Sequence, residues 1–371
     1  MITELTQHQF YPESPFDLFT LKLQGTPIEI GEDLARVACE RHRVDPTAIS
    51  DSALQTKQTL VSRYCPALVD RAAGVSNVLD RDLQSFDPYS LSLVETPPPF
   101  ACSAAFIGEH NGGLLLRNFD FTLHSFPELL GAKVSGVRPM VDPIYLMTIA
   151  PKEGFRSIAV VSMDLFTGAF DGINDRGFCV ALLALSNGTR QIADARFDAF
   201  DESAIPRILL ESCETVEEAI ALFSEMPKQT LFIPCHYIVG DRNGNAAVLE
   251  WNEASGVGIA RREKLQPLLC TNHYLSPLRH SAPEEGHEAE SKQRLATLEA
   301  HLPQCSDDDE GLWNAAETVR QNAVGDDGSV IGGTLWTALY RTQLPGLDVR
   351  FLMQTRGAGP VYSQKYSVRF D

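Results

Sequence analysis

The sequence lacks the features that mark several special classes of protein. None of its apolar runs approaches the ~20 residues of a membrane-spanning helix, and it contains no repeat and no low-complexity segment. Its eight cysteines include no CxxC pair and no cysteine–histidine set with the spacing of a zinc site. The opening residues have neither a basic start nor an apolar stretch. We therefore expect no signal peptide, free thiols and a cytoplasmic location.

Basic residues are scarce relative to acidic ones. Lys and Arg number 31 against 49 Asp and Glu, which gives a formal net charge of −18. Such a chain repels phosphate backbones and anionic lipid, so we expect no nucleic-acid partner and no membrane partner. The 44% hydrophobic and 22% charged residues are ordinary for a globular protein, and 371 residues can bury a large core without metals or disulfides.

The first hundred residues are predicted to be mostly helical. Residues 14–24 alternate apolar and polar side chains like an edge strand, and residues 29–43 and 51–79 carry helical patterns. The prolines within residues 97–100 then stop any helix and favour an extended segment.

From Ala101 onward the pattern is rich in strands. Apolar runs flank four turn sequences and predict hairpins there: HNGG (110–113), NDRG (174–177), DRNGN (241–245) and LPG (344–346). Further strands are predicted at 144–150, 157–163 and 266–275, and helices at 204–226, 291–301 and 311–321. This order favours an α+β fold in which two packed sheets are flanked by helices.

Cys102 opens the first strand of this β-rich region. A thiol is intrinsically nucleophilic, but it needs a base or a depressed pKa to react at neutral pH. Arg117 and Asp120 lie on the returning strand of the same hairpin, where a guanidinium would favour the thiolate and a carboxylate could orient a protonated amine. From position alone, a buried structural cysteine beside a surface ion pair is the more common arrangement.

The motifs around this hairpin resemble those of the choloylglycine hydrolase-like and isopenicillin-N acyltransferase-like enzymes, which are N-terminal-nucleophile hydrolases of the cysteine type. The resemblance covers most of the chain, in the same order. Its motifs are LQGTPIEIG (23–31), CSAA (102–105), RNFDF (117–121), GINDRGF (172–178), YIVGDRNGNAAVLE (237–250), LLCTNHYLS (268–276) and GTLWTALY (333–340). It implies a four-layer αββα sandwich, with a mostly helical pro-segment over residues 1–101 and a catalytic region over residues 102–371.

The resemblance also implies a role for each site residue. The chain would cut its own Ala101–Cys102 bond, because a peptide nitrogen is not a base whereas a free α-amino group has a pKa of about 7.7–8.0. Cys102 would then supply both the nucleophile and the base. Arg117 would stabilise the thiolate, and Asp120 would bind the freed amino group. Asn272 would donate its side-chain N–H to the oxyanion of the tetrahedral intermediate.

Other polar residues near these motifs are interpreted as structural. We expect a structural or pocket-wall role for His273 and a turn-forming role for Asn174. For Arg294 the resemblance offers a match to an arginine that supports the nucleophile in the bile-salt branch, but a helix-surface position is favoured. Two roles remain open for Glu250: a structural carboxylate whose hydrogen bonds are satisfied, or a residue of the active site. In the fungal enzyme of this family, one arginine is suited to binding a substrate carboxylate. The corresponding residue in this chain is Ile331, so we expect an apolar acyl pocket rather than a site for β-lactam acids.

The favoured function is that of an amide hydrolase or amide-forming acyltransferase. It would pass the acyl group of a non-peptide linear amide or thioester, through acyl-Cys102, to water or an amine, in a biosynthetic or detoxifying role. Its partners would be these small molecules, and the two cleaved fragments would stay associated with each other. The chemistry requires no metal or organic cofactor.

Two alternatives remain. One is a non-processing binding or scaffold relative of the same fold. The other is a papain-like enzyme that pairs Cys102 or Cys235 with His236 or His273. It is the least favoured, because no helix follows Cys102 to lower the pKa of its thiol.

Overall fold

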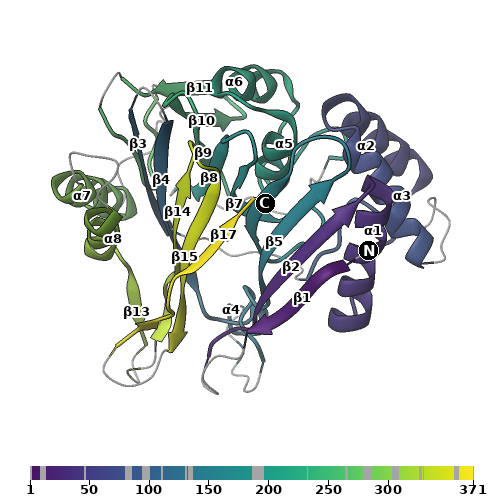
Figure 1. The fold of residues 1–371 in the computed structure, drawn as a ribbon, viewed down its shortest axis with the longest axis horizontal. Helices are drawn as coiled ribbons and strands as arrows, with labels where there is room; N and C mark the ends of the chain where they lie inside the picture. Colours follow the sequence, from purple (N-terminus) through teal and green to yellow (C-terminus); the bar gives the residue numbers. More distant parts are fainter. Residues whose placement is uncertain are drawn as a thin grey trace.

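A computed structural model describes residues 2–8, 14–45, 47–79, 86–93, 101–109, 112–129, 132, 137–185, 196–231, 233–263, 266–276, 278, 286–302, 309–325, 328, 330–354 and 359–370. These residues form two β-sheets that pack face to face, with helices on the outer face of each sheet (Figure 1). The layer order is therefore helix, sheet, sheet, helix. The predicted α+β fold with a four-layer αββα sandwich is confirmed.

The first sheet contains nine described strands in the spatial order β1-β2-β5-β6-β7-β8-β9-β10-β11. Their bounds are Ile2–His8 (β1), Leu18–Gly25 (β2), Ile144–Pro151 (β5), Ser157–Val161 (β6), Ala169–Asn174 (β7), Cys179–Ala184 (β8), Cys235–Gly240 (β9), Ala246–Asn252 (β10) and Gly256–Arg261 (β11). β2 lies between β1 and β5, so the prediction of an edge strand over residues 14–24 is wrong. The largely polar sequence of β1 gave no strand signal, yet β1 pairs with β2 and takes the edge position.

The second sheet has the described order β12-β3-β4-β14-β15-β16, with β13 beside β14 and β17 beside β15. Its strands are Ala101–Glu109 (β3), Gly112–Thr122 (β4), Leu268–Cys270 (β12), Asn322–Val324 (β13), Val330–Arg341 (β14), Gly346–Gln354 (β15), Val361–Tyr362 (β16) and Tyr366–Arg369 (β17). The four predicted hairpins are all present. The strand predicted over 266–275 is shorter, because it ends at Cys270.

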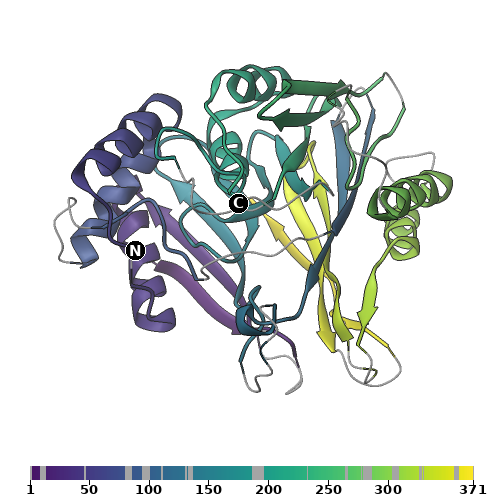
Figure 2. The same cartoon turned by 180° about the vertical axis from the view of Figure 1, so that it is seen from behind.

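Helices cover both outer faces. Their bounds are Pro27–Arg36 (α1), Val37–Arg41 (the π-helix η1), Asp51–Tyr64 (α2), Ala67–Leu79 (α3), Phe126–Leu129 (α4), Ala204–Ser212 (α5), Val216–Glu225 (α6), Gly286–His301 (α7) and Asp309–Thr318 (α8). α1–α3, α5 and α6 lie on the side of the first sheet, and α7 and α8 on that of the second (Figures 1 and 2). The helix predicted over 204–226 is two helices, because Thr215 and Glu218 form a capping box that starts α6.

The first 101 residues are joined closely to the rest of the chain. β2 pairs in parallel with β5 along its whole length. α3 is tied to α5 by the buried Arg71, which donates to both carboxylate oxygens of Glu211 at 2.7 and 2.9 Å. This segment therefore adds two strands to the first sheet besides its helices. The division of the chain at residue 101 stays a prediction.

Two further predictions from the sequence concern the state of the cysteines and the absence of membrane-spanning helices. The seven described cysteines are free thiols, as predicted, and Cys305 and the proline segment 97–100 lie outside the described residues. No helix within the described ranges is long and apolar enough to span a bilayer.

Candidate active site

The hairpin β3–β4 holds Cys102 between the two sheets. In its register Ala101 faces Asp120 and Cys102 faces Phe119. Side chains alternate between the faces of a strand. Cys102 belongs to the large core between the sheets, whereas Ala105 belongs to a smaller core under α7 and α8. The Cys102 side chain is completely buried.

Asn272 reaches Cys102 because β12 ends early. β12 pairs with β3 only from Leu268 opposite Phe106 to Cys270 opposite Ala104. Beyond that point the backbone N–H of Cys102 donates to Oδ1 of Asn272 at 3.0 Å. The Nδ2 group of Asn272 donates to the carbonyl of Ala184 at 2.7 Å. The side chain of Asn272 thus continues the pairing of β3 where the neighbouring strand stops.

Arg294 of α7 also reaches the nucleophile, so its predicted position on a helix surface is wrong. Its Nη1 donates to the carbonyl of Cys102 at 2.7 Å and to Oγ of Ser103 at 3.1 Å, and its Nη2 donates to Oδ1 of Asn272 at 2.6 Å. A signal was available in the sequence, because Arg294 lies four residues before the apolar Leu298, which is buried. That spacing puts Arg294 on the inward face of the helix.

Arg117 is held beneath Cys102 by an ion pair that joins the two sheets. Its side chain lies within hydrogen-bonding reach of the thiol. Its Nε contacts Asp171 of β7, and its Nη2 donates to the carbonyl of Leu182 at 2.6 Å. Both side chains of the pair are fully buried. An aspartate inside the apolar strand AFDGIN was a signal that the sequence analysis did not use.

Asp171 has two further buried partners. The indole N–H of Trp336 donates to one carboxylate oxygen at 2.9 Å, and the Tyr340 hydroxyl donates to the other at 2.7 Å. Both donors come from β14 in the opposite sheet. Asp171 is thereby fixed in place and in turn fixes the guanidinium of Arg117.

Asp120 is buried with one carboxylate oxygen satisfied. Oδ1 accepts from the Thr334 hydroxyl at 2.6 Å. Oδ2 has no hydrogen-bond partner among the described residues, and the nearest cation is Arg294 at 3.9 Å. Burial raises the pKa of Asp120 to about 6, although Arg294 opposes this shift. The unsatisfied oxygen lies on the residue directly across the hairpin from Ala101.

The Cys102 thiol is protonated in the uncleaved chain at neutral pH. Burial raises the pKa of the thiol, and the nearby Arg117 only partly offsets that effect. A buried thiol of this kind needs a base before it can act as a nucleophile.

A second cysteine–histidine contact, between Cys270 and His236, lies close by. Nε2 of His236 lies 3.3 Å from Sγ of Cys270 and 2.6 Å from the carbonyl of Thr271. A carbonyl oxygen accepts only, so Nε2 carries a proton and has no lone pair for the thiol. Among the described contacts, neither Cys102 nor Cys235 has a hydrogen bond to His236 or His273, so the papain-like alternative finds no support.

Glu250 is a satisfied structural carboxylate. It accepts from the backbone N–H groups of Leu275 and Ser276 at 2.7 and 2.8 Å, and it lies 3.3 Å from His236. These contacts fix the turn that carries Asn272. The question that the sequence left open for Glu250 is thereby answered in favour of structure.

Asn174 and His273 contact structural groups. Asn174 donates to the carbonyls of Leu210 and Cys213 and accepts from two N–H groups of its own turn, as its predicted turn role requires. His273 shares hydrogen bonds with the hydroxyls of Thr271 and Ser291 at 3.2 and 2.9 Å.

The four predicted site residues therefore lie together. Cys102, Arg117, Asp120 and Asn272 converge on the start of β3, and Arg294 joins them from α7. Their roles in a reaction stay predictions. Within the described ranges, no three His, Cys, Asp or Glu side chains are grouped so that they could hold a metal ion.

Comparison with known families places the chain among the acyltransferases. It belongs to the acyl-coenzyme A:6-aminopenicillanic acid acyl-transferase family, whose model matches residues 108–352. That range includes Arg117, Asp120, Asn272 and Arg294, and it begins after Cys102. The predicted family and enzyme class are confirmed.

Comparisons with individual proteins are more distant. No curated protein matches the chain. Penicillin V acylase from Agrobacterium tumefaciens is similar in structure, with 14% identity, a TM-score of 0.46, and coverage of 72% of this chain and 86% of that chain. A mutant of conjugated bile acid hydrolase from Clostridium perfringens is 10% identical with a TM-score of 0.44, over 72% of this chain and 97% of that chain.

Proposed function

We propose that this chain is a self-processing cysteine N-terminal-nucleophile enzyme. It would cut its own Ala101–Cys102 bond and then cleave or transfer the acyl group of a non-peptide linear amide or thioester through an acyl-Cys102 intermediate. The observation that supports the proposal is that Asn272 and Arg294 both bind the backbone of Cys102, while the unsatisfied oxygen of Asp120 lies on the residue that faces Ala101.

Self-cleavage would proceed by an N-to-S acyl shift. The Cys102 sulfur attacks the carbonyl carbon of Ala101, the carbon–nitrogen bond breaks, and the thiol proton ends on the departing nitrogen. Water then hydrolyses the thioester. The products are the Ala101 carboxylate and a Cys102 with a free thiol and a free α-amino group.

The contacts of Asp120 support the proposal that its carboxylate binds the freed amino group. The new amine would form at Cys102, next to the position that Asp120 faces across the hairpin. Oδ2 of Asp120 is buried and lacks a hydrogen-bond partner in the described structure, so an ammonium group there would satisfy it. Cleavage would thus supply the partner that the uncleaved chain lacks.

Turnover would use the freed amine as the base. The amine takes the proton of the Cys102 thiol, and the thiolate beside Arg117 attacks the substrate carbonyl. Asn272 would donate to the oxyanion, and the cationic Arg294 would favour negative charge near the same point. The leaving amine departs with a proton, and water or a second amine takes the acyl group from sulfur.

Trapping the acyl-enzyme tests the function directly. Purified protein is mixed with a panel of N-acyl anilides, quenched in acid within seconds and digested for mass spectrometry. We expect a mass increase equal to the acyl group on the peptide that begins at Cys102. Cys102→Ala should lose the adduct, whereas Cys179→Ala, which removes another buried thiol, should keep it. An adduct on another residue, or release of the amine without any Cys102 adduct, would overturn the proposal.

The alternative is a relative that keeps the fold but only binds. It predicts no amine release from any member of the panel and an intact 371-residue chain.

We also retain the predicted cytoplasmic location and the biosynthetic or detoxifying role as part of the proposal. Cell fractionation with an antibody against the chain tests the location.

A further inference from the structure

Ser291 of α7 binds the backbone of the residue that is predicted to donate to the oxyanion. Its Oγ accepts from the backbone N–H of Asn272 at 2.7 Å. Arg294 lies three residues further along α7 and donates to Oδ1 of the same asparagine at 2.6 Å. Residues three apart lie on one face of a helix. One face of α7 therefore contacts Asn272 at both its backbone and its side chain.

The hydrogen bonds of the Ser291 hydroxyl have one consistent arrangement. The Thr271 hydroxyl donates to the carbonyl of Ser291 at 3.0 Å, and Oγ of Ser291 donates to Oγ1 of Thr271 at 2.9 Å. Both hydroxyl hydrogens are then used, so Nδ1 of His273, 2.9 Å from Oγ of Ser291, carries a proton and donates. The Ser291 oxygen thus accepts two hydrogen bonds, and its hydrogen has a single place.

Ser291 supplies a partner that the sheet does not supply at this point. β12 ends at Cys270, so its ladder with β3 stops before Asn272. The side chain of Ser291 is fully buried. A buried backbone N–H that loses its partner is costly, so without the Ser291 hydroxyl the backbone of Asn272 would shift toward another acceptor.

We propose that Ser291 is a positioning residue of the reaction, which fixes the backbone of Asn272 so that its side chain meets the Cys102 nitrogen and the oxyanion. The described contacts of Ser291 include no reacting atom, so it acts through Asn272. The inference deepens the proposed function and rests on it. A displacement of about 1 Å in such a group can cost on the order of 10²-fold in rate.

Three substitutions of Ser291 test this role. Ser291→Ala removes the acceptor, and we expect the rate of self-cleavage and kcat for acyl p-nitroanilides to fall roughly tenfold or more, with KM little changed. Threonine and valine have the same shape, but only threonine keeps a hydroxyl. Ser291→Thr should therefore recover most of the loss, and Ser291→Val should not. A wild-type rate in Ser291→Ala, or equal rates in the other two variants, would overturn the proposal.

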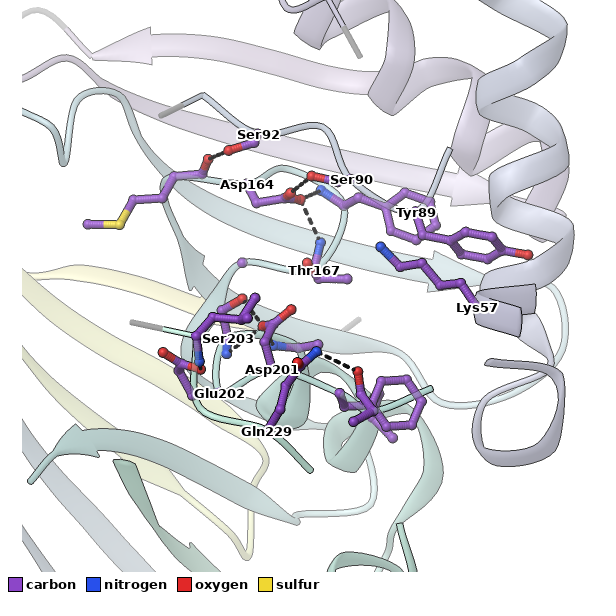
Figure 3. A pocket seen from close by; sticks show the side chains of 18 of the residues that line it. Lys57, Tyr89, Ser90, Ser92, Asp164, Thr167, Asp201, Glu202, Ser203 and Gln229 are labelled. Atoms are coloured by element: carbon purple, nitrogen blue, oxygen red, sulfur yellow. Dashed lines mark hydrogen bonds between the residues drawn. The ribbon is translucent and has the colours of Figure 1, made fainter. Parts of the chain in front are cut away.

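A matched control lies at a cavity apart from the site. Ser90 donates to Asp164 at 2.6 Å beside a cavity of about 290 Å³ (Figure 3). Among the described residues that line this cavity, none is one of the four predicted site residues. Ser90→Ala should therefore cleave and turn over like the wild type. An equal loss of rate in Ser90→Ala and Ser291→Ala would assign the effect to lost stability and would contradict the inference.

A double variant distinguishes positioning from a general structural role. If Ser291 acts through Asn272, then Ser291→Ala should lower neither rate further once Asn272→Ala is present. A further fall of roughly tenfold in the double variant would show that Ser291 acts independently of Asn272, and it would overturn the proposal.

Hydrogen exchange tests the contact without any reaction. In the full Cys102→Ala chain, mass spectrometry of peptides within residues 268–276 follows the backbone N–H of Asn272. We expect Ser291→Ala to speed its exchange roughly tenfold or more relative to Ser90→Ala. Unchanged exchange would contradict the inference. Faster exchange, in a protein whose wild type neither cleaves itself nor turns over any amide, would support the contact of Ser291 with Asn272 and refute the enzyme function.

Discussion

Oδ1 of Asn272 accepts a hydrogen bond at 3.0 Å from the backbone N–H of Cys102, the nitrogen that self-cleavage would turn into a free amine. The same oxygen accepts from Arg294 at 2.6 Å. One side chain therefore links the peptide bond to be cut with a cation from α7. This arrangement fixes the orientation of the Ala101–Cys102 peptide group before any reaction takes place.

Two substitutions of Asn272 should separate cleavage from turnover. Asn272→Asp keeps an acceptor for Cys102 and Arg294 but removes the N–H that would bind the oxyanion. We expect it to cleave itself and to lose roughly 10²–10³ in kcat for amide turnover. Asn272→Ala should be slow in both. Full amide turnover by Asn272→Asp would show that another group stabilises the oxyanion.

Arg294→Gln should slow self-cleavage. The variant loses charge-assisted hydrogen bonds to the Cys102 carbonyl and to Asn272. If the transition state loses the equivalent of one such bond, about 1.5–3 kcal/mol, the first-order rate of cleavage should fall roughly 10–100-fold. The measurement is the fraction of cut chain against time after rapid purification. Lys292→Gln on the same helix, which removes the ion pair with Glu288, serves as the control. Equal rates in the two variants would remove Arg294 from the mechanism.

Asp120→Asn should stabilise the uncleaved chain in a pH-dependent way. Burial raises the pKa of Asp120 from 3.8 to about 6, so the folded state favours the protonated carboxyl. The stability from that proton is present below about pH 4 and is lost as the pH rises through 6. In a Cys102→Ala background, the substitution should therefore add on the order of 3 kcal/mol to the free energy of unfolding at pH 8. At about pH 3.5 it should add almost nothing.

Urea titrations at the two pH values check this prediction. In the cleaved wild type the same substitution should instead reduce amide turnover, because the amino group loses its carboxylate partner. The same stability change at both pH values would argue that packing, and not the buried charge of Asp120, causes it.

Asp171→Asn should make the Cys102 thiol more acidic. Without the carboxylate, the positive charge of Arg117 acts on the thiol unopposed, which lowers the pKa of the thiol. In the cleaved enzyme, the pH midpoint for iodoacetamide labelling of Cys102 should therefore move down. The protein should also lose about 3–5 kcal/mol of stability through the broken buried pair. Asp175→Asn, at the turn of the same hairpin, should leave the midpoint unchanged. Faster labelling at every pH with an unmoved midpoint would indicate loosened structure instead.

Much of the fold follows from local patterns in the sequence. The hairpin of Cys102 was predictable because two apolar runs flank a glycine-containing turn, and the split of helix 204–226 is encoded in Thr215 and Glu218. The strands β1 and β17 escaped prediction. β1 is largely polar and β17 has only four residues, and each forms because a neighbouring strand offers hydrogen bonds.

The site was predictable only in part. Arg117 and Asp120 lie on the strand that pairs with β3, so their nearness to Cys102 follows from the hairpin itself. Asn272 lies 170 positions further along the chain, and only its resemblance to a family motif linked it to Cys102. Asp171 belongs to the other sheet, and its contact with Arg117 depends on how the sheets stack. No local pattern encodes that stacking.

Intact mass under denaturing conditions tests the central claim most directly. Freshly purified wild type and Cys102→Ala are compared by mass spectrometry after incubation at neutral pH. The account predicts two wild-type fragments of 101 and 270 residues, split between Ala101 and Cys102, and one 371-residue chain in the variant. A single full-length chain in both proteins would contradict it, because the amino group that serves as the base would never form.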